Sequence, residues 1–215
     1  MTGEEFAEKI LADKLNARAV VCGENFRFGK GAVCGPEELE EFGKKFGFEV
    51  CVCGLVKKNG FDISSEIIRE MIKDGKIAAA GELMGENYFI DAKVINGNRI
   101  GRTLDFPTIN QKFAARQLIP RKGVYASETT VNGKKYPSVT NIGVKPTVEK
   151  NIAPLAETNI IDYKGDLYGQ NVRVELYDFI RDEKKFSSLE ELKYRINEDV
   201  HTAMKMYTSL NDKNN

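Results

Sequence analysis

The chain has 215 residues, with 32 Lys and Arg against 32 Asp and Glu, so its formal net charge at pH 7 is zero. This balance gives no global field that would draw the protein onto nucleic acid or an anionic membrane, and we expect neither partner. No apolar run approaches the roughly 20 residues of a membrane helix, and the opening MTGEEFAEKI lacks the features of a signal peptide. We therefore expect a cytoplasmic protein.

The first part of the chain alternates between helical and strand-like segments. Apolar spacing and strand-like runs predict this order: helix 3–16, strand 18–23, helix 37–47, strand 48–56, helix 63–75 and helix 77–85. Ser64 or Ser65 can cap the fifth segment. The alternation is typical of a parallel α/β sheet, but it supplies only half of one, and the sheet should keep an exposed edge.

Four cysteines lie in the first quarter of the chain: Cys22, Cys34, Cys51 and Cys53. The last two share one face of an apolar, strand-like run, and no CxxC motif or nearby histidine completes a zinc site. We expect reduced, structural thiols. The single histidine, His201, lies in a helical stretch and is expected at the surface.

From Tyr88 the pattern changes to consecutive strands. Alternating or β-branched runs occupy 88–96, 123–131, 134–143, 156–162 and 170–179, with Gly-containing turns such as Asn132-Gly133. Short connections favour an antiparallel sheet, and five or six such strands most often close into a small barrel or sandwich.

The chain ends with an amphipathic helix that begins near a pair of serines. Either serine can cap it with a glutamate three residues later. Leu189, Leu192, Ile196 and Val200 form one apolar stripe, which we expect to pack on the barrel.

The segment 96–110, NGNRIGRTLDFPTIN, carries the densest chemistry. Glycine lets backbone N–H groups approach phosphate oxygens, an arginine supplies charge, and hydroxyl and amide oxygens are hard ligands suited to Mg²⁺. An ordinary loop between strands is the alternative. The candidate phosphate-binding residues are Gly101, Arg102, Thr103, Thr108 and Asn110, of which the last two are the candidate metal ligands.

Five ordered blocks resemble the riboflavin kinase module of the bacterial bifunctional riboflavin kinase/FMN adenylyltransferase family: GRTLDFPTIN, PRKGVYAS, TNIGVKPT, ETNIIDYKGDLYG and DEKKFSSLEELKYRI. Upstream, GENFRFGKGA and DISSEIIRE resemble the adenylyltransferase domain. The resemblance implies an α+β protein: a partial Rossmann-like half-domain at 1–85, then a six-stranded antiparallel Greek-key barrel with a C-terminal helix at 86–215.

The resemblance also implies that the adenylyltransferase half is incomplete. The family's HxGH-type motif is absent, because no histidine precedes His201, and the helix start keeps Ser64, Ser65 and Arg69 but presents Glu66 and Ile67. We expect a truncated remnant that does not make FAD alone. Its half-sheet implies two alternative partners: a separate N-terminal adenylyltransferase fragment, or another copy of the chain through self-association.

For the barrel, the resemblance implies transfer of the γ-phosphate of ATP to the 5'-hydroxyl of riboflavin, giving FMN, with Mg²⁺ accompanying ATP. Thr108 and Asn110 match the family's Mg-nucleotide contacts, and Glu157 matches its catalytic glutamate. In isolation Glu157 reads as a solvated surface charge. Asn141 and Thr147 are nucleotide-binding candidates, although turn formation explains them equally well.

Arg181 resembles a flavin-side arginine, and pairing with Asp182 or Glu183 at the surface is the alternative. The aromatic residues Tyr125, Phe179 and Phe186 are expected in the barrel core.

Two positions depart from the family pattern: Asp105 replaces a glycine and Asn159 a histidine. Because of Asp105, a second hypothesis stays open: the chain is a catalytically weak flavin- or nucleotide-binding protein. Because the first domain is incomplete, a third stays open: the chain is half of a split FAD synthetase.

Overall fold

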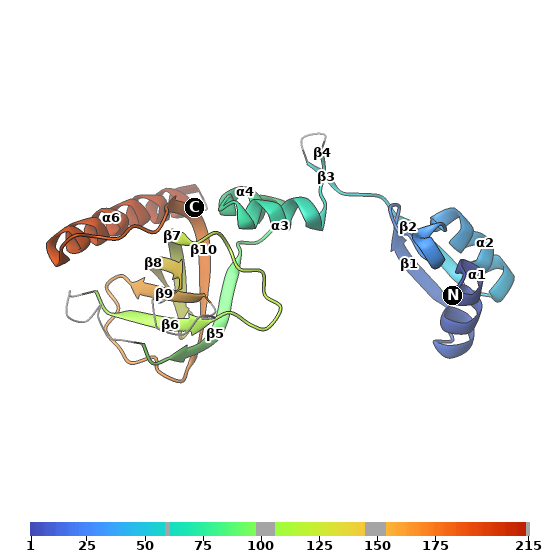
Figure 1. Cartoon of the computed structure of the whole chain (residues 1–215), viewed down its shortest axis with the longest axis horizontal. Coiled ribbons are helices and arrows are strands. Elements are labelled where there is room, and N and C mark those ends of the chain that lie inside the picture. The colour runs from blue at the N-terminus through green and yellow to red at the C-terminus, as the bar shows by residue number, and fades with distance from the viewer. Residues whose placement is uncertain (59–60, 98–105, 145–153, 214–215) are drawn as a thin grey trace. The chain divides into compact units, whose positions relative to one another are not determined.

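The computed structural model describes residues 1–58, 61–97, 106–144 and 154–213 (Figure 1). The chain forms two compact units, Met1–Ser64 and Ser65–Asn215. In the described residues, no helix has both the length and the apolar character needed to cross a membrane.

The first unit follows the predicted order of helices and strands. Its elements are α1 (Gly3–Phe6), the π-helix η1 (Ala7–Lys14), β1 (Ala19–Gly23), the 3-10 helix η2 (Lys30–Ala32), α2 (Pro36–Phe46), β2 (Glu49–Cys53), β3 (Lys57–Lys58) and β4 (Phe61–Asp62). The strands β1 and β2 pair in parallel, as expected, whereas the hairpin of β3 and β4 was not anticipated. Ala7, Leu11, Phe28, Leu39 and Phe48 form the core.

The sheet of the first unit leaves apolar and thiol groups exposed. Val21 is 68% exposed, and Cys51, its parallel partner, and Cys53 are exposed too. All four thiols are free, which confirms the expectation of reduced cysteines. Two-stranded parallel sheets normally have both faces covered, so this surface is unusual for its type.

Two helices that the sequence assigned to the N-terminal half belong to the second unit. They are α3 (Ser65–Lys73) and α4 (Ile77–Met84). Ile72, Ile77 and Ala80 are buried in the same core cluster as the barrel interior. The compact units therefore divide before α3, whereas the sequence placed the domain boundary near residue 85.

A closed six-stranded barrel forms the second unit, and the predicted topology is confirmed. Its strands lie in the order β10-β5-β6-β9-β8-β7. Strands β7, β8 and β9 follow one another, and β10 returns beside β7, which is a Greek key. The strands are β5 (Phe89–Ile95), β6 (Thr108–Lys112), β7 (Gly123–Val131), β8 (Lys134–Gly143), β9 (Leu155–Ile160) and β10 (Asn171–Arg181).

The strand β6 was not predicted, because its residues were interpreted by their chemistry instead of their alternation. Its side chains alternate between the two faces of the barrel wall. Gln111 points inward, is fully buried, and donates from Nε2 to the carbonyls of Ala92 and Val172, each at 2.7 Å. Gln111 thus ties β6 to two other strands from inside the barrel.

Polar side chains continue around the barrel interior. The hydroxyls of Ser127, Thr140 and Thr158 are linked in a chain with separations of 2.8 and 2.9 Å. Tyr125 is fully buried and packs edge-on against Phe179 at 5.3 Å, which confirms the core prediction for these two rings. Burial raises the pKa of the Tyr125 phenol well above its usual range.

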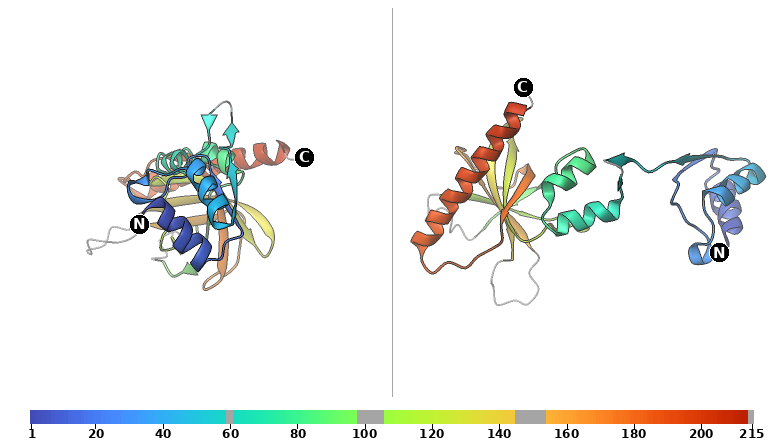
Figure 2. Two further views of the ribbon diagram at one scale, coloured as in Figure 1. Left: turned by 90° about the vertical axis from the view of Figure 1, so that its right-hand side faces the viewer. Right: turned by 90° about the horizontal axis from the view of Figure 1, so that it is seen from above.

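The helix α6 (Leu189–Lys213) lies along the outside of the barrel (Figure 2). Its C-terminal part contributes Val200, Ala203 and Met206 to an apolar cluster with β7 and β8. The predicted stripe is only partly correct: Leu189 is 62% exposed, because the helix begins beyond the part of the barrel that it covers. His201 is exposed, as expected.

The first turn of α6 is capped as the serine pair predicts. The backbone N–H of Glu191 donates to Ser188 Oγ at 3.1 Å, and the Glu191 carboxylate accepts from Ser187 N–H at 2.9 Å. The bond from the Ser187 backbone N–H contributes most to lowering the pKa of the Glu191 carboxyl to about 2. The bonds from the Ser187 hydroxyl and from Lys184 also lower it.

We predict that Gln111→Ala destabilises the barrel by about 2–4 kcal/mol, because it removes two hydrogen bonds from the Gln111 amide to strand carbonyls and opens a cavity in the barrel interior. All eight tyrosines follow residue 87, and the chain has no tryptophan, so tyrosine fluorescence during urea unfolding reports the second unit alone. The exposed Gln170→Ala is the matched control and should change stability by less than about 0.5 kcal/mol. Equal losses of stability in Gln111→Ala and Gln170→Ala would contradict the proposed role of Gln111 in linking the three strands.

Candidate active site

A cavity of about 330 Å³ lies between the outer face of the barrel and α6. Polar and apolar side chains line it in a mixture that is typical of small-molecule sites. The lining residues are Phe106, Thr108, Val124, Val139, Asn141, Glu157, Asn159, Arg181, Glu183, Lys184, Phe186, Leu192, Ile196 and Asp199. All come from the second unit.

Strand pairing places the polar lining residues in two adjacent rows. In the first row, Val124 pairs with Asn141, Asn141 with Glu157, and Glu157 with Asn110. Because side chains alternate along a strand, and Ala156 and Thr158 are fully buried, the intervening Glu157 points outward. The row therefore presents Asn141 and Glu157 to the cavity.

The second row brings Thr108 to the same cavity. Thr108 pairs with Asn159, and Asn159 pairs with Val139. Thr108 and Glu157 are thus diagonal neighbours across β6 and β9, a relation that puts side chains about 7–8 Å apart. A small hydroxyl-bearing group fits between side chains at that spacing.

Asn110 lies beside this cavity and does not line it. It is 4% exposed and stands directly opposite Glu157. A Cβ added to Gly97 would come within 2.4 Å of Asn110 Nδ2 and 2.8 Å of Oδ1, so any larger residue at position 97 would have to displace the Asn110 amide. The sequence analysis included Gly97 only as part of the segment 96–110, and its close approach to Asn110 was missed.

Asn159 supports the segment that leads into Thr108. Its Nδ2 donates to the carbonyl of Pro107 at 2.9 Å. Asn159, one of the two departures from the family pattern, therefore fixes the backbone immediately before Thr108 from the neighbouring strand β9.

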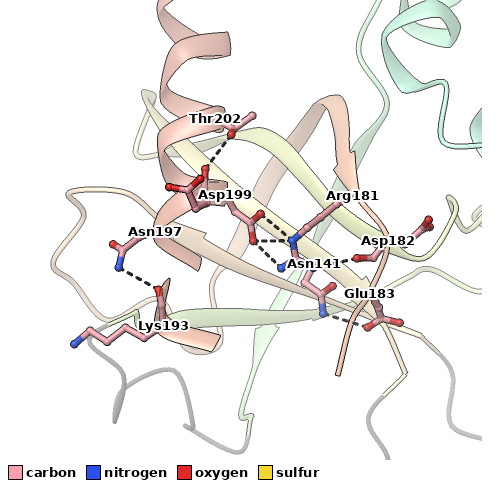
Figure 3. A network of polar contacts seen from close by, with 9 residues as sticks. Asn141, Arg181, Asp182, Glu183, Lys193, Asn197, Asp199 and Thr202 are labelled. Carbon is pink, nitrogen blue, oxygen red and sulfur yellow. Dashed lines mark hydrogen bonds and ion pairs between the residues drawn. The ribbon is translucent and has the colours of Figure 1, made fainter. Parts of the chain in front are cut away.

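Arg181 is paired, but with a partner that the sequence interpretation did not name. Its Nε donates to Asp199 Oδ1 at 2.9 Å and its Nη2 to Oδ2 at 2.7 Å, while Nη1 donates to the carbonyl of Asp182 (Figure 3). The alternative that the sequence left open, a surface pairing with the side chain of Asp182 or Glu183, is therefore wrong in its partner. The Arg181 side chain is 17% exposed and that of Asp199 is 5% exposed.

A periodicity signal could have found Asp199. It falls on the face of α6 that carries Leu192, Ile196 and Ala203, at helical spacing. A carboxylate within an apolar stripe requires a partner when the stripe is buried, and β10 supplies it.

Phe186 corrects another expectation. It lines the cavity and is not in the barrel core, because the segment after β10 crosses outside the barrel wall. The Arg181 guanidinium lies 5.6 Å from the centre of its ring. Nearby, Asn141 Nδ2 donates to Glu183 Oε1 at 3.5 Å, a long contact, and a Cβ on Gly143 would collide with the same carboxylate.

A second, smaller cavity of about 60 Å³ adjoins the first at Thr108. Pro107, Thr108 and Ile109 line it together with the segment after β9, which includes Tyr163 and Asp166. Thr108 therefore lies at the boundary of two cavities on the same unit.

Several candidate residues lie outside the described part of the chain, so their positions stay predictions. They are Gly101, Arg102, Thr103, Asp105 and Thr147. Within the described residues, no group of three or more His, Cys, Asp or Glu side chains can hold a metal ion. A hydroxyl and an amide oxygen, from Thr108 and Asn110, suit a Mg²⁺ ion that takes its other ligands from phosphates and water.

Comparison with known proteins identifies the family. The riboflavin kinase family model matches residues 84–207, more than half of the chain, and the FAD synthetase model matches residues 1–67. The chain belongs to the riboflavin kinase family, and the segment that precedes the kinase match resembles FAD synthetase.

Two curated relatives match nearly the whole chain. The bifunctional riboflavin kinase/FMN adenylyltransferase of Escherichia coli is 36% identical over 208 residues, 96% of this chain and 66% of the relative. That of Pseudomonas fluorescens is 33% identical over 203 residues, 94% of this chain and 65% of the relative. The chain thus spans slightly under two thirds of their length.

A crystal structure described as a macrolide-efflux protein from Streptococcus pneumoniae is also similar. It is 32% identical, with a TM-score of 0.80 over 95% of this chain and 65% of that protein. This likeness supports the fold of both units.

We predict that Gly97→Ala destabilises the second unit by about 1–3 kcal/mol, because the added methyl group must displace the Asn110 amide. Gly81→Ala is the matched control: Gly81 lies in α4, its nearest contact would be 3.4 Å, and alanine there should be neutral or stabilising by up to about 1 kcal/mol. Tyrosine-monitored urea unfolding measures both, and a neutral Gly97→Ala would contradict the close approach.

Proposed function

We propose that the barrel unit is an ATP:riboflavin 5'-phosphotransferase that makes FMN and ADP, with Glu157 as the catalytic base. The observation that carries the proposal is that Glu157 and Thr108, from different strands, face one cavity of about 330 Å³. Membership of the riboflavin kinase family supports the same reaction.

In this proposal the ribityl end of riboflavin lies between Glu157 and Thr108. Phosphoryl transfer depends mainly on holding donor and acceptor in line. The 5'-oxygen forms a bond to the γ-phosphorus, the bond from that phosphorus to the β,γ-bridging oxygen breaks, and the hydroxyl proton passes to the Glu157 carboxylate. ADP leaves with the bridging oxygen.

The nucleotide is proposed to approach Thr108 from the side of the smaller cavity, and Gly101, Arg102 and Thr103 stay nucleotide candidates on sequence grounds. Thr108 and Asn110 would hold Mg²⁺ through their side-chain oxygens, and the bound ion would offset charge on the transferring phosphate. Asn159 supports this role because it fixes the Pro107 carbonyl beside Thr108. Asn141 and Arg181 line the larger cavity, and we propose that both contact the flavin, which for Asn141 replaces the nucleotide role expected from the sequence; Thr147 stays a nucleotide candidate on sequence grounds.

FAD synthesis by this chain alone is not part of the proposal. Purified protein incubated with riboflavin and Mg-ATP, with flavins separated by chromatography, tests it directly. We expect FMN without FAD. Saturable riboflavin binding without product would favour the binding-protein hypothesis, and FAD formed only with an added adenylyltransferase fragment would favour a split enzyme.

We predict that Glu157→Gln lowers kcat by about 10²–10⁴-fold, because the amide cannot accept the hydroxyl proton. The Kd of riboflavin, measured by quenching of flavin fluorescence, should change by less than about threefold. Glu175→Gln is the matched control: Glu175 is a half-buried glutamate of β10 that pairs with Arg173 and does not line the cavity. Equal loss of binding and turnover in Glu157→Gln would mean a structural role.

We also predict that Thr108→Val weakens Mg-nucleotide binding by about tenfold or more, because valine has nearly the same shape and no ligand oxygen. Calorimetric titration with Mg-ADP measures this without turnover. Thr130→Val on β7 removes a hydroxyl outside both cavities and should leave the titration unchanged. Unchanged binding in Thr108→Val would remove Thr108 from the metal site.

A further inference from the structure

We infer that the Arg181–Asp199 ion pair makes the larger cavity selective for an uncharged flavin over a phosphorylated one, so that FMN binds there more weakly than riboflavin. The inference rests on the proposed function and deepens it, because it names the feature that separates substrate from product at the same site.

The cavity wall carries more negative than positive groups. Its described lining includes three carboxylates, on Glu157, Glu183 and Asp199, and two cations, on Arg181 and Lys184. Under the proposed function the 5'-phosphate of FMN would lie beside Glu157 and Thr108, in the cavity that these carboxylates line, and like charges in a partly desolvated site repel each other.

Both cations of the wall are already engaged. Asp199 binds Arg181 through both carboxylate oxygens, at 2.9 and 2.7 Å, and the Asp182 carbonyl accepts from Nη1 (Figure 3). Lys184 Nζ lies 3.3 Å from Glu191. An arginine fork binds phosphate well when its donors are free, but here a buried carboxylate occupies the fork and cancels its charge.

The position of the pair makes it the controlling element. Asp199 is the first buried residue of α6, and Leu192 and Ile196, two turns and one turn before it, line the cavity. The carboxylate is therefore carried by the helix that covers the cavity. The neutral isoalloxazine and polyol of riboflavin encounter no corresponding charge penalty.

The test compares the Kd of riboflavin with the Kd of FMN, measured by fluorescence titration of the full chain without nucleotide. We expect wild type to bind riboflavin more tightly. Asp199→Asn keeps an acceptor for Arg181 but removes the charge, and it should shift the ratio toward FMN by about tenfold. The shift should shrink in 0.5 M salt, where the Debye length is about 4 Å.

Two further variants isolate the cause. The double variant Arg181→Gln with Asp199→Asn should lose the gain in FMN affinity, because no guanidinium is left to bind phosphate. Glu198→Gln is the matched control, since it removes one negative charge from an exposed neighbouring residue of α6 and should leave the ratio unchanged.

If Asp199→Asn does not fold, Glu183→Gln carries the test, because Glu183 is exposed and lines the same cavity; it should also move the ratio toward FMN. A wild type that prefers FMN, or an unchanged ratio in the variant tested, would overturn the inference. Absence of riboflavin binding to wild type would instead overturn the proposed function.

Discussion

A slip of one residue in the pairing of β6 with β9 would turn Glu157 into the barrel and bring Ala156 out. The site depends on this register more than on any single contact. The interior determines the register, because Ala156 and Thr158 are fully buried and Gln111 reaches the carbonyls of two other strands. The polar interior of the barrel thus determines which side chains reach the cavity outside it.

The helix α6 adds a second constraint, from outside. Its C-terminal part is anchored by Val200, Ala203 and Met206, whereas the turns over the cavity contain no buried residue before Asp199. The Arg181–Asp199 pair lies at that transition. A buried ion pair contributes little net stability, but losing one partner is costly, so it fixes geometry better than it stabilises the fold. The shape and the charge of the cavity therefore depend on the same two residues.

Much of the fold could be predicted because local patterns agree with it. Period-two alternation gave five of the six barrel strands, and the serine pair gave the start of α6. The strand β6 was missed because Pro107, Thr108 and Asn110 suggest a ligand loop when they are considered without a partner strand. Phe186 was missed for a related reason: its contacts depend on where β10 and α6 meet, which no local pattern encodes. Asp199 differs, because its helical spacing within the apolar stripe is a local signal, although its partner Arg181 on β10 is not encoded locally.

The Greek-key crossing explains why motifs distant in sequence could be expected to act together. The chain leaves β6, builds β7 and β8, and returns as β9 beside β6, which sets Thr108 opposite Asn159 and diagonal to Glu157. Every described residue that lines the larger cavity lies between Phe106 and Asp199, within the second unit. The described side chains of the proposed kinase site therefore all come from the second unit.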